Sequence, residues 1–175
     1  MRFDDQTLKD LNEKYLEVTQ ITRKLIDRLV VVASKLRDPK AKEYMWHGVL
    51  RRLGILNRCI ENVFTLFPPE NRDRLSDETI KDVEINLHAF FVNVAGVFDN
   101  LAWVFVMENG LFGTRQEGKL EKPDVGLFLK RTQRYLPQLL REHLTAAKIA
   151  KCTQLIQKSI VTRSRTGSLS IFRAH

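Results

Sequence analysis

The sequence predicts an all-α fold, an antiparallel bundle of four to five helices that includes one very apolar central helix. Three observations predict it. Apolar residues recur in steps of three and four, prolines and glycines separate these stretches, and alternating strand-like patterns are weak. With 175 residues, of which 43% are hydrophobic and 29% charged, the chain suits one soluble domain with a sizeable core.

The first helix is expected to run from Asp4 or Asp5, either of which can cap it, to about Leu36. Asp38–Pro39 ends it, because the residue before a proline avoids the helical region. Steps of three and four place its apolar residues on one face: Leu8, Leu11, Tyr15, Val18, Ile21, Leu25, Leu29, Val32 and Leu36.

The second helix is expected from about Lys42 to Phe67, where Pro68–Pro69 stops it. Its apolar face comprises Met45, Trp46, Val49, Leu50, Leu53, Leu56, Ile60, Val63, Phe64 and Phe67.

The third helix is predicted from Asp77 to about Asn109, with Ser76 as its N-cap and Gly110 just past its end. It is apolar nearly all round, so we expect it at the centre of the bundle, contacted on several sides. Residues 89–107 are long enough to span a bilayer, but Asp99 would then sit in mid-membrane at a cost of about 2.5–3.5 kcal/mol. A buried helix of a soluble, cytoplasmic protein is the better interpretation, without membrane attachment.

The rest of the chain is expected to form a polar loop (Gly113–Pro123), a short helix (Val125–Tyr135) and a further helix that Pro137 opens and that continues to about Val161. Residues 1–162 then make a single helical bundle domain. Residues 163–175 form an Arg/Ser-rich basic tail without periodicity.

Positive charge is concentrated at the C-terminal end. The formal charge of +8 includes six units contributed after Glu142, where no acidic residue occurs. The preceding part carries only a small excess of basic residues, so the basic balance describes a tail rather than a domain. One hypothesis is that this tail binds nucleic acid, with an affinity that falls steeply with salt.

Motifs for the common catalytic chemistries are missing from the sequence. The two cysteines lack metal-ligand spacing, no two histidines stand four apart on a helix, and no phosphate-binding glycine loop occurs. We therefore expect neither a metal site nor a cofactor, and we predict no catalytic residue in this chain.

A line of polar residues marks the apolar helix. Asn86, Asn93 and Asn100 are spaced by seven, and Asp99 lies beside the lower end of that line. Asn93, Asp99 and Asn100 are candidates for a groove that contacts a ligand or nucleic acid, and a buried Asp99 would have a raised pKa. The alternative is that these amides bond to neighbouring helices, since buried polar groups must be paired.

A second candidate site combines basic and aromatic residues. Lys130, Arg131 and Arg134 stand between Phe128 and Tyr135. Such interleaving holds single-stranded RNA by charge and stacking. The charged outer face of an amphipathic helix produces the same pattern.

Two stretches carry a family resemblance. Residues 85–105, INLHAFFVNVAGVFDNLAWVF, and residues 125–137, VGLFLKRTQRYLP, resemble a group of bacterial proteins similar to the HEPN superfamily. The resemblance covers about a fifth of the chain and implies an all-helical, commonly dimeric protein of ribonuclease, toxin or defence ancestry. It also implies RNA, or a protein partner such as an antitoxin. The superfamily's catalytic signature, an arginine followed four to six residues later by a histidine, does not occur in this chain.

The C-terminal segment offers an explanation for the missing signature. Synonymous codons can be chosen for residues 160–173 that, when read from the third base of each codon, spell R-Y-A-I-A-H-R-I-P-L-Y-I-P. This text contains the arginine–histidine motif and resembles the helix R-D-A-L-A-H-R-I-P-L-Y-I-P of the related group. We therefore hypothesise that the chain is out of frame from about Thr145 onward, which would leave it catalytically inactive. A native basic tail is the alternative.

Three functions remain open on the sequence: a catalytically impaired HEPN-like helical protein, a structural or interaction module that forms a homodimer, and a nucleic-acid binder that uses the basic tail.

Overall fold

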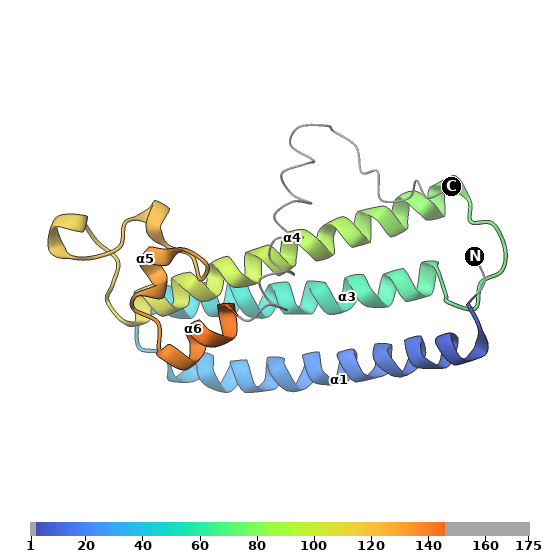
Figure 1. Ribbon diagram of the computed structural model, residues 1–175, viewed down its shortest axis with the longest axis horizontal. Coiled ribbons are helices and arrows are strands. Elements are labelled where there is room, and N and C mark those ends of the chain that lie inside the picture. The colour runs from blue at the N-terminus through green and yellow to red at the C-terminus, as the bar shows by residue number, and fades with distance from the viewer. Residues whose placement is uncertain (1–2, 146–175) are drawn as a thin grey trace.

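The computed structural model describes residues 3–145, and these form an all-α bundle without strands, as predicted. Three long rods lie side by side and alternate in direction (Figure 1). They are α1 (Asp5–Lys35), a continuous rod made of α2 (Pro39–Glu43), η1 (Tyr44–Leu50) and α3 (Arg51–Leu66), and α4 (Asp77–Glu108). The predicted continuation to Val161 and the basic tail of residues 163–175 lie outside the described residues.

Helix α1 begins where its sequence caps it, because the side chain of Asp4 accepts a hydrogen bond from the Thr7 amide at 2.7 Å. Its packed face differs from the predicted one. Val18, Ile21, Leu25 and Val32 are exposed, and their places on the packed face are taken by the next residues along the chain, Thr19, Thr22, Ile26 and Ala33. That face, the inner stripe, consists of Leu8, Leu11, Tyr15, Thr19, Thr22, Ile26, Leu29, Ala33 and Leu36. The prediction assigned the most apolar residues to the packed face. The face that packs in the structure is instead a line along the helix that includes two threonines and an alanine.

The middle rod starts at Pro39, three residues earlier than predicted. Asp38 accepts a hydrogen bond from the Ala41 amide at 2.8 Å, and Pro39 fits the first turn of a helix. Asp38–Pro39 therefore ends one helix and also begins the next. Residues 44–50 then widen into a π-helix, which the sequence did not indicate.

Helix α4 has the predicted start and end. Ser76 caps its first turn, and Gly110 takes the left-handed conformation, with φ of 62°, just after the helix. Its place in the bundle differs from expectation, because the middle rod lies between α1 and α4 (Figure 1). Among the described long helices, α4 packs on α2, η1 and α3, while α1 packs on η1 and α3.

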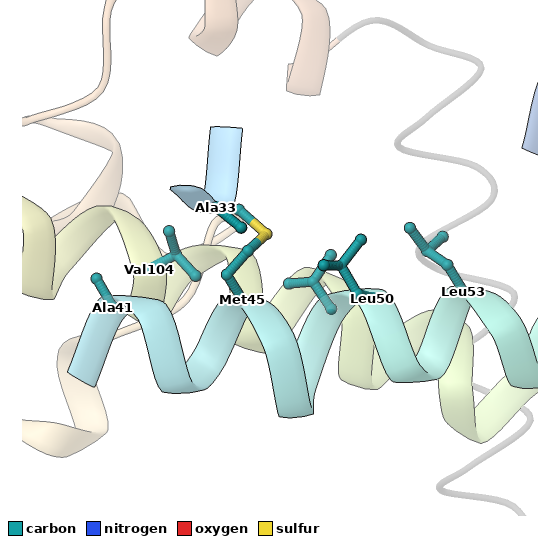
Figure 2. Packing of buried hydrophobic residues seen from close by; sticks show 7 residues of the cluster. Ala33, Ala41, Met45, Leu50, Leu53 and Val104 are labelled. Atoms are coloured by element: carbon teal, nitrogen blue, oxygen red, sulfur yellow. The ribbon is translucent and has the colours of Figure 1, made fainter. Parts of the chain in front are cut away.

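The core follows from this layered order. Figure 2 shows Met45 of the π-helix reaching toward Ala33 of α1, and Val104 of α4 belongs to the same cluster. Leu50 and Leu53 continue the cluster along the rod. A second cluster, made of Ala102, Leu127, Leu136 and Leu144, joins the C-terminal half of α4 to the residues that follow it.

Polar contacts fasten both ends of the bundle. The carboxylate of Glu108, at the end of α4, accepts from the Arg37 and Asp38 amides at 3.0 Å. At the far end, the Asn12 side chain donates to Glu70 at 2.7 Å, and Tyr15 stacks on Phe64 with ring centroids 4.5 Å apart.

The helix predicted for Val125–Tyr135 is wrong. The structure has a short 3-10 helix η3 (Lys122–Asp124), a turn, and α5 limited to Lys130–Gln133. The buried hydroxyl of Thr132 donates to the Asp124 carbonyl at 2.6 Å and accepts from the Gly126 amide at 3.1 Å. These side-chain bonds satisfy backbone groups that a helix would otherwise pair, so they favour a turn. Helix α6 (Gln138–Thr145) then starts directly after Pro137.

Candidate functional site

The asparagine line of α4 faces the middle rod. Asn86 accepts from the Asn62 side chain at 2.9 Å, and Asn93 accepts from Nη1 of Arg52 at 2.9 Å. The amide groups of Asn86, Asn93 and Asn100 each donate to the backbone carbonyl four residues earlier in α4. The polar groups are therefore used within the interface between α3 and α4, and this supports the structural interpretation of the line.

Two glycines make room for this polar contact. A side-chain carbon on Gly48 would collide with the Oδ1, Cγ and Cβ atoms of Asn100. A carbon on Gly96 would lie 2.6 Å from Nε and Cζ of Arg52. Gly96 thus makes room for the Arg52 guanidinium. Nε of Arg52 is buried and has no hydrogen-bond partner among the described residues.

Asp99 lies outside the asparagine contacts. It is exposed, and loss of hydration among its neighbours raises the pKa of its carboxyl, an effect that the positive charge of Arg52 partly offsets. Of the three candidates on α4, Asp99 is thus the one that is exposed and makes no hydrogen bond to another described residue.

The segment between α4 and α5, predicted as a loop, has a defined conformation that its own hydrogen bonds hold in place. Phe112 and Leu120 form an isolated β-bridge, and the Leu120 amide donates to the Leu111 carbonyl at 2.8 Å. Thr114 and Glu117 form a capping box around η2 (Arg115–Glu117), and Gly118 closes the turn with φ of 72°. This arrangement turns Arg115 and Lys119 toward the segment that carries α5.

Asp124 holds the two segments together. Its carboxylate, which is 7% exposed, accepts two hydrogen bonds from Arg115 at 3.1 Å and one from Arg131 at 3.0 Å. The hydrogen bonds from Arg115, followed by that from Arg131, hold the pKa of Asp124 below its ordinary value. The acid thereby fixes two guanidinium groups on one side of the loop.

These groups line a basic pocket with a volume of about 350 Å³. We call it the basic pocket, and its lining residues are Arg115, Gly118, Lys119, Leu120, Arg131, Arg134 and Tyr135. The Tyr135 hydroxyl donates to the Gly118 carbonyl at 2.8 Å. This bond joins the residues that follow α5 to the turn after η2. Within residues 3–145 neither Lys119 nor Arg134 forms an ion pair.

The structure places only some residues of the second predicted site at the basic pocket. Arg131, Arg134 and Tyr135 line the basic pocket, while Lys130 is exposed but does not line it. Phe128 instead points into the second core cluster, where its ring meets Phe98 edge-on at 5.3 Å. Sequence reasoning missed Arg115 and Lys119, because only the folded loop brings them next to α5. The Thr114–Glu117 capping box was the one local signal for that turn.

The described residues hold little that could serve nucleophilic or metal chemistry. No group of three or more His, Cys, Asp or Glu side chains within residues 3–145 could hold a metal ion. Burial raises the pKa of the Cys59 thiol, which makes it less reactive. Nε2 of His88 is buried and has no hydrogen-bond partner within residues 3–145, whereas Nδ1 of His143 lies 2.9 Å from the Leu139 carbonyl oxygen of its own helix.

In the described part of the chain, α4 is the one helix long and apolar enough to cross a membrane by length and composition. Its three asparagines bond to α3 or to its own backbone, as expected of a helix within a bundle.

Searches against protein-family models, curated proteins and solved structures find no match to this chain.

Proposed function

We propose that the chain is a helical RNA-binding protein of HEPN-like ribonuclease or toxin ancestry, and that it lacks the catalytic residues of that ancestry. The observation that carries the proposal is the basic pocket. Its lining supplies four cationic side chains and the exposed aromatic ring of Tyr135. Cationic groups bind phosphates, and an aromatic face stacks on unpaired bases.

The proposal agrees with the sequence resemblance at one specific place. The segment 125–137, which resembles the related group, supplies Arg131, Arg134 and Tyr135. Catalysis is not part of the proposal, because the chain has no arginine–histidine pair at the required spacing. Without a general acid or base and a charge-stabilising cation, RNA is bound and not cleaved.

Binding is tested by fluorescence anisotropy with a labelled single-stranded RNA over a range of salt concentrations. The double variant Lys119→Glu/Arg134→Glu changes two pocket groups that form no ion pair within residues 3–145. We expect weaker binding. The slope of log affinity against log salt concentration should be shallower by about 1.4, the value for two lost phosphate contacts to a single strand. The control Arg72→Glu/Arg74→Glu makes the same charge change in the exposed loop before α4. An equal loss in both variants would attribute the binding to net charge and contradict the pocket.

The basic tail is the competing binding element. Replacing Arg163, Arg165 and Arg173 by glutamine tests it in the same assay. If this variant loses RNA affinity while the pocket variant keeps it, the tail is the binding element and the pocket is not.

The ancestry is tested on the DNA that encodes residues 144–175. We expect the shifted frame to spell the arginine–histidine motif followed by R-I-P-L-Y-I-P. The chain with the restored frame should then cleave RNA, and replacing its new histidine by alanine should abolish cleavage. DNA that carries no such text would remove the ribonuclease part of the proposal.

An interaction module is the second candidate function. It is favoured by the exposed apolar side chains along α1, of which Ile21 is 55% exposed and Val32 44%. A homodimer and a cytoplasmic location remain proposals in both cases.

A further inference from the structure

The basic pocket is compact. Its lining residues come from two short segments, 115–120 and 131–135, which the contacts of Asp124 and Tyr135 tie together. Its volume of about 350 Å³ lies near the lower end of the range of about 300–1,000 Å³ that is usual for sites that take one small ligand. The pocket therefore suits one compact group, such as a single nucleotide, rather than a length of strand.

The positive charge of the pocket exceeds what one internal phosphate of RNA requires. The lining contributes four cationic side chains, and two acids, Glu121 and Asp124, form ion pairs with Arg115 and Arg131. Four cations against two acids leave a net charge of +2. The Glu117 carboxylate does not line the pocket and accepts instead from the backbone of its own capping box at 3.3 Å. An internal phosphate carries one negative charge, whereas a phosphomonoester carries about 1.5 to 2 at pH 7, so the excess matches a phosphomonoester.

Both guanidinium groups keep donors that Asp124 does not use. Arg115 donates to this carboxylate through Nε and Nη2, and Arg131 donates through Nη1. Nη1 of Arg115 and both Nε and Nη2 of Arg131 take no part in these bonds. Because the buried carboxylate fixes both groups in advance, a ligand does not have to order them. A phosphomonoester offers one more terminal oxygen than an internal phosphate, which suits two forked guanidinium groups and the point charge of Lys119.

Tyr135 provides a surface for the base that follows such a phosphate. Its hydroxyl is engaged with the Gly118 carbonyl at 2.8 Å, while its ring is 40% exposed. An exposed aromatic ring beside a cationic pocket stacks on an unpaired base of any type. The pocket and the ring together therefore accommodate one phosphate and one base.

We propose that the basic pocket binds the terminal phosphate of an RNA strand, a phosphomonoester, with the terminal base stacked on Tyr135. This inference rests on the proposed function, because RNA supplies the strand end, and it adds that the protein recognises an end rather than an internal position. The 5′-phosphate and the 3′-phosphate are the same chemical group, so the experiment has one arm for each.

Fluorescence anisotropy with RNAs of one sequence, labelled on an internal base, tests the preference. The first carries a 5′-phosphate, the second a 3′-phosphate, and the third a hydroxyl group at each end. At least one phosphorylated RNA should bind about tenfold more tightly than the hydroxyl-ended RNA, which is the effect of one further charge-assisted hydrogen bond. A hydroxyl-ended RNA that is longer by two nucleotides adds the same charge within the strand and should gain much less. An equal gain would mean that the protein responds to total charge, and would overturn the inference.

A pair of variants tests whether the preference belongs to the basic pocket. Lys119→Gln/Arg134→Gln removes two charges from the lining and should bind all these RNAs equally. The matched control Lys122→Gln/Lys130→Gln removes two exposed charges from the same part of the chain but outside the lining, and should keep the preference. A preference that both variants lose, or that both keep, would contradict the assignment to the pocket.

The pH dependence gives a test that leaves the protein unaltered. A phosphomonoester loses its second negative charge near pH 6, whereas an internal phosphate does not titrate in this range. The preference for the phosphorylated end should therefore shrink when the pH is lowered from about 7 to about 5. A preference that stays constant over this range would exclude the second charge as its cause and overturn the inference.

The outcomes also separate this inference from the proposed function. RNA binding that depends on Lys119 and Arg134 but not on an end phosphate would leave the proposed function intact and overturn the recognition of ends. A complete absence of RNA binding would overturn both.

Discussion

Nη1 of Arg52 donates to Oδ1 of Asn93 at 2.9 Å, and this bond links α3 to α4 at the centre of the bundle. Asn93 is only 8% exposed, and the Arg52 guanidinium fills the space beside Gly96. Nε of the same guanidinium already lacks a hydrogen-bond partner within the part of the chain that the structure describes. A charged group is thus held in the helix interface by a neutral amide, a contact that is costly to break from one side only.

The first prediction concerns this pair. Asn93→Ala should lower the free energy of unfolding by about 1–3 kcal/mol, because it leaves a partly buried guanidinium with fewer hydrogen bonds. The double variant Arg52→Met/Asn93→Ala removes both partners and should be more stable than the sum of the single changes Arg52→Met and Asn93→Ala predicts. Urea unfolding of the four proteins measures the coupling, expected at about 0.5–3 kcal/mol. Strictly additive effects would show that the two side chains do not depend on each other.

The second prediction compares two glycines of the middle rod. Gly48→Ala should destabilise the protein by about 1–3 kcal/mol, because the new carbon collides with the Asn100 side chain, including the Cβ atom, which a rotation of the side chain does not move. Gly54 lies in the same rod, but a carbon there meets nothing within 4 Å. Gly54→Ala should therefore stabilise by about 0.5–1 kcal/mol through helix propensity alone. Thermal unfolding distinguishes the two, and a gain in both variants would mean that Asn100 moves aside at little cost.

The third prediction concerns acid unfolding through Asp124. Arg115 and Arg131 hold the pKa of this carboxyl below its ordinary value of about 3.9. A lowered folded-state pKa stabilises the fold above the unfolded value, and the contribution is lost as the pH falls through the folded-state pKa. Asp124→Asn should be less stable than the unaltered chain at neutral pH, and the difference should shrink below about pH 3.9. Melting temperatures over the acid range test this, and a constant difference would exclude the carboxylate charge as the cause.

The fourth prediction concerns Asp99, whose effect on stability changes with pH in the opposite direction to that of Asp124. Desolvation raises the pKa of Asp99, so the folded chain favours the protonated carboxyl. Ionisation then costs stability as the pH rises above the unfolded value of about 3.9. Asp99→Asn should raise the melting temperature at neutral pH and leave it unchanged in strong acid. A loss of stability at neutral pH would show that the Asp99 carboxylate has a favourable partner.

The sequence alone determined the helical class and most of the helix ends of this protein. Asp4, Ser76 and Gly110 act at the predicted ends of α1 and α4, because capping depends on groups only a few residues apart. Apolar spacing likewise indicated three long helices. These features are local, so a pattern of residue types is sufficient to specify them.

The tertiary structure decided which faces meet. The inner stripe of α1 runs through Thr19, Thr22 and Ala33. The middle rod lies between α1 and α4, so the central place that the sequence assigned to α4 is taken by α2, η1 and α3. Hydrophobicity alone ranks Ile21 and Leu25 above these residues, but helix packing selects a geometric line and requires small side chains where helices approach.

The candidate site depended on tertiary structure as well. Arg131, Arg134 and Tyr135 were visible as a local pattern, whereas Arg115 and Lys119 join them only because Gly118, Asp124 and Thr132 fold two loops together. The Thr132 hydroxyl replaces helix hydrogen bonds with turn contacts to residues six and eight positions away. Such contacts are formed between residues that no helical period relates, and only the folded chain brings them within bonding distance.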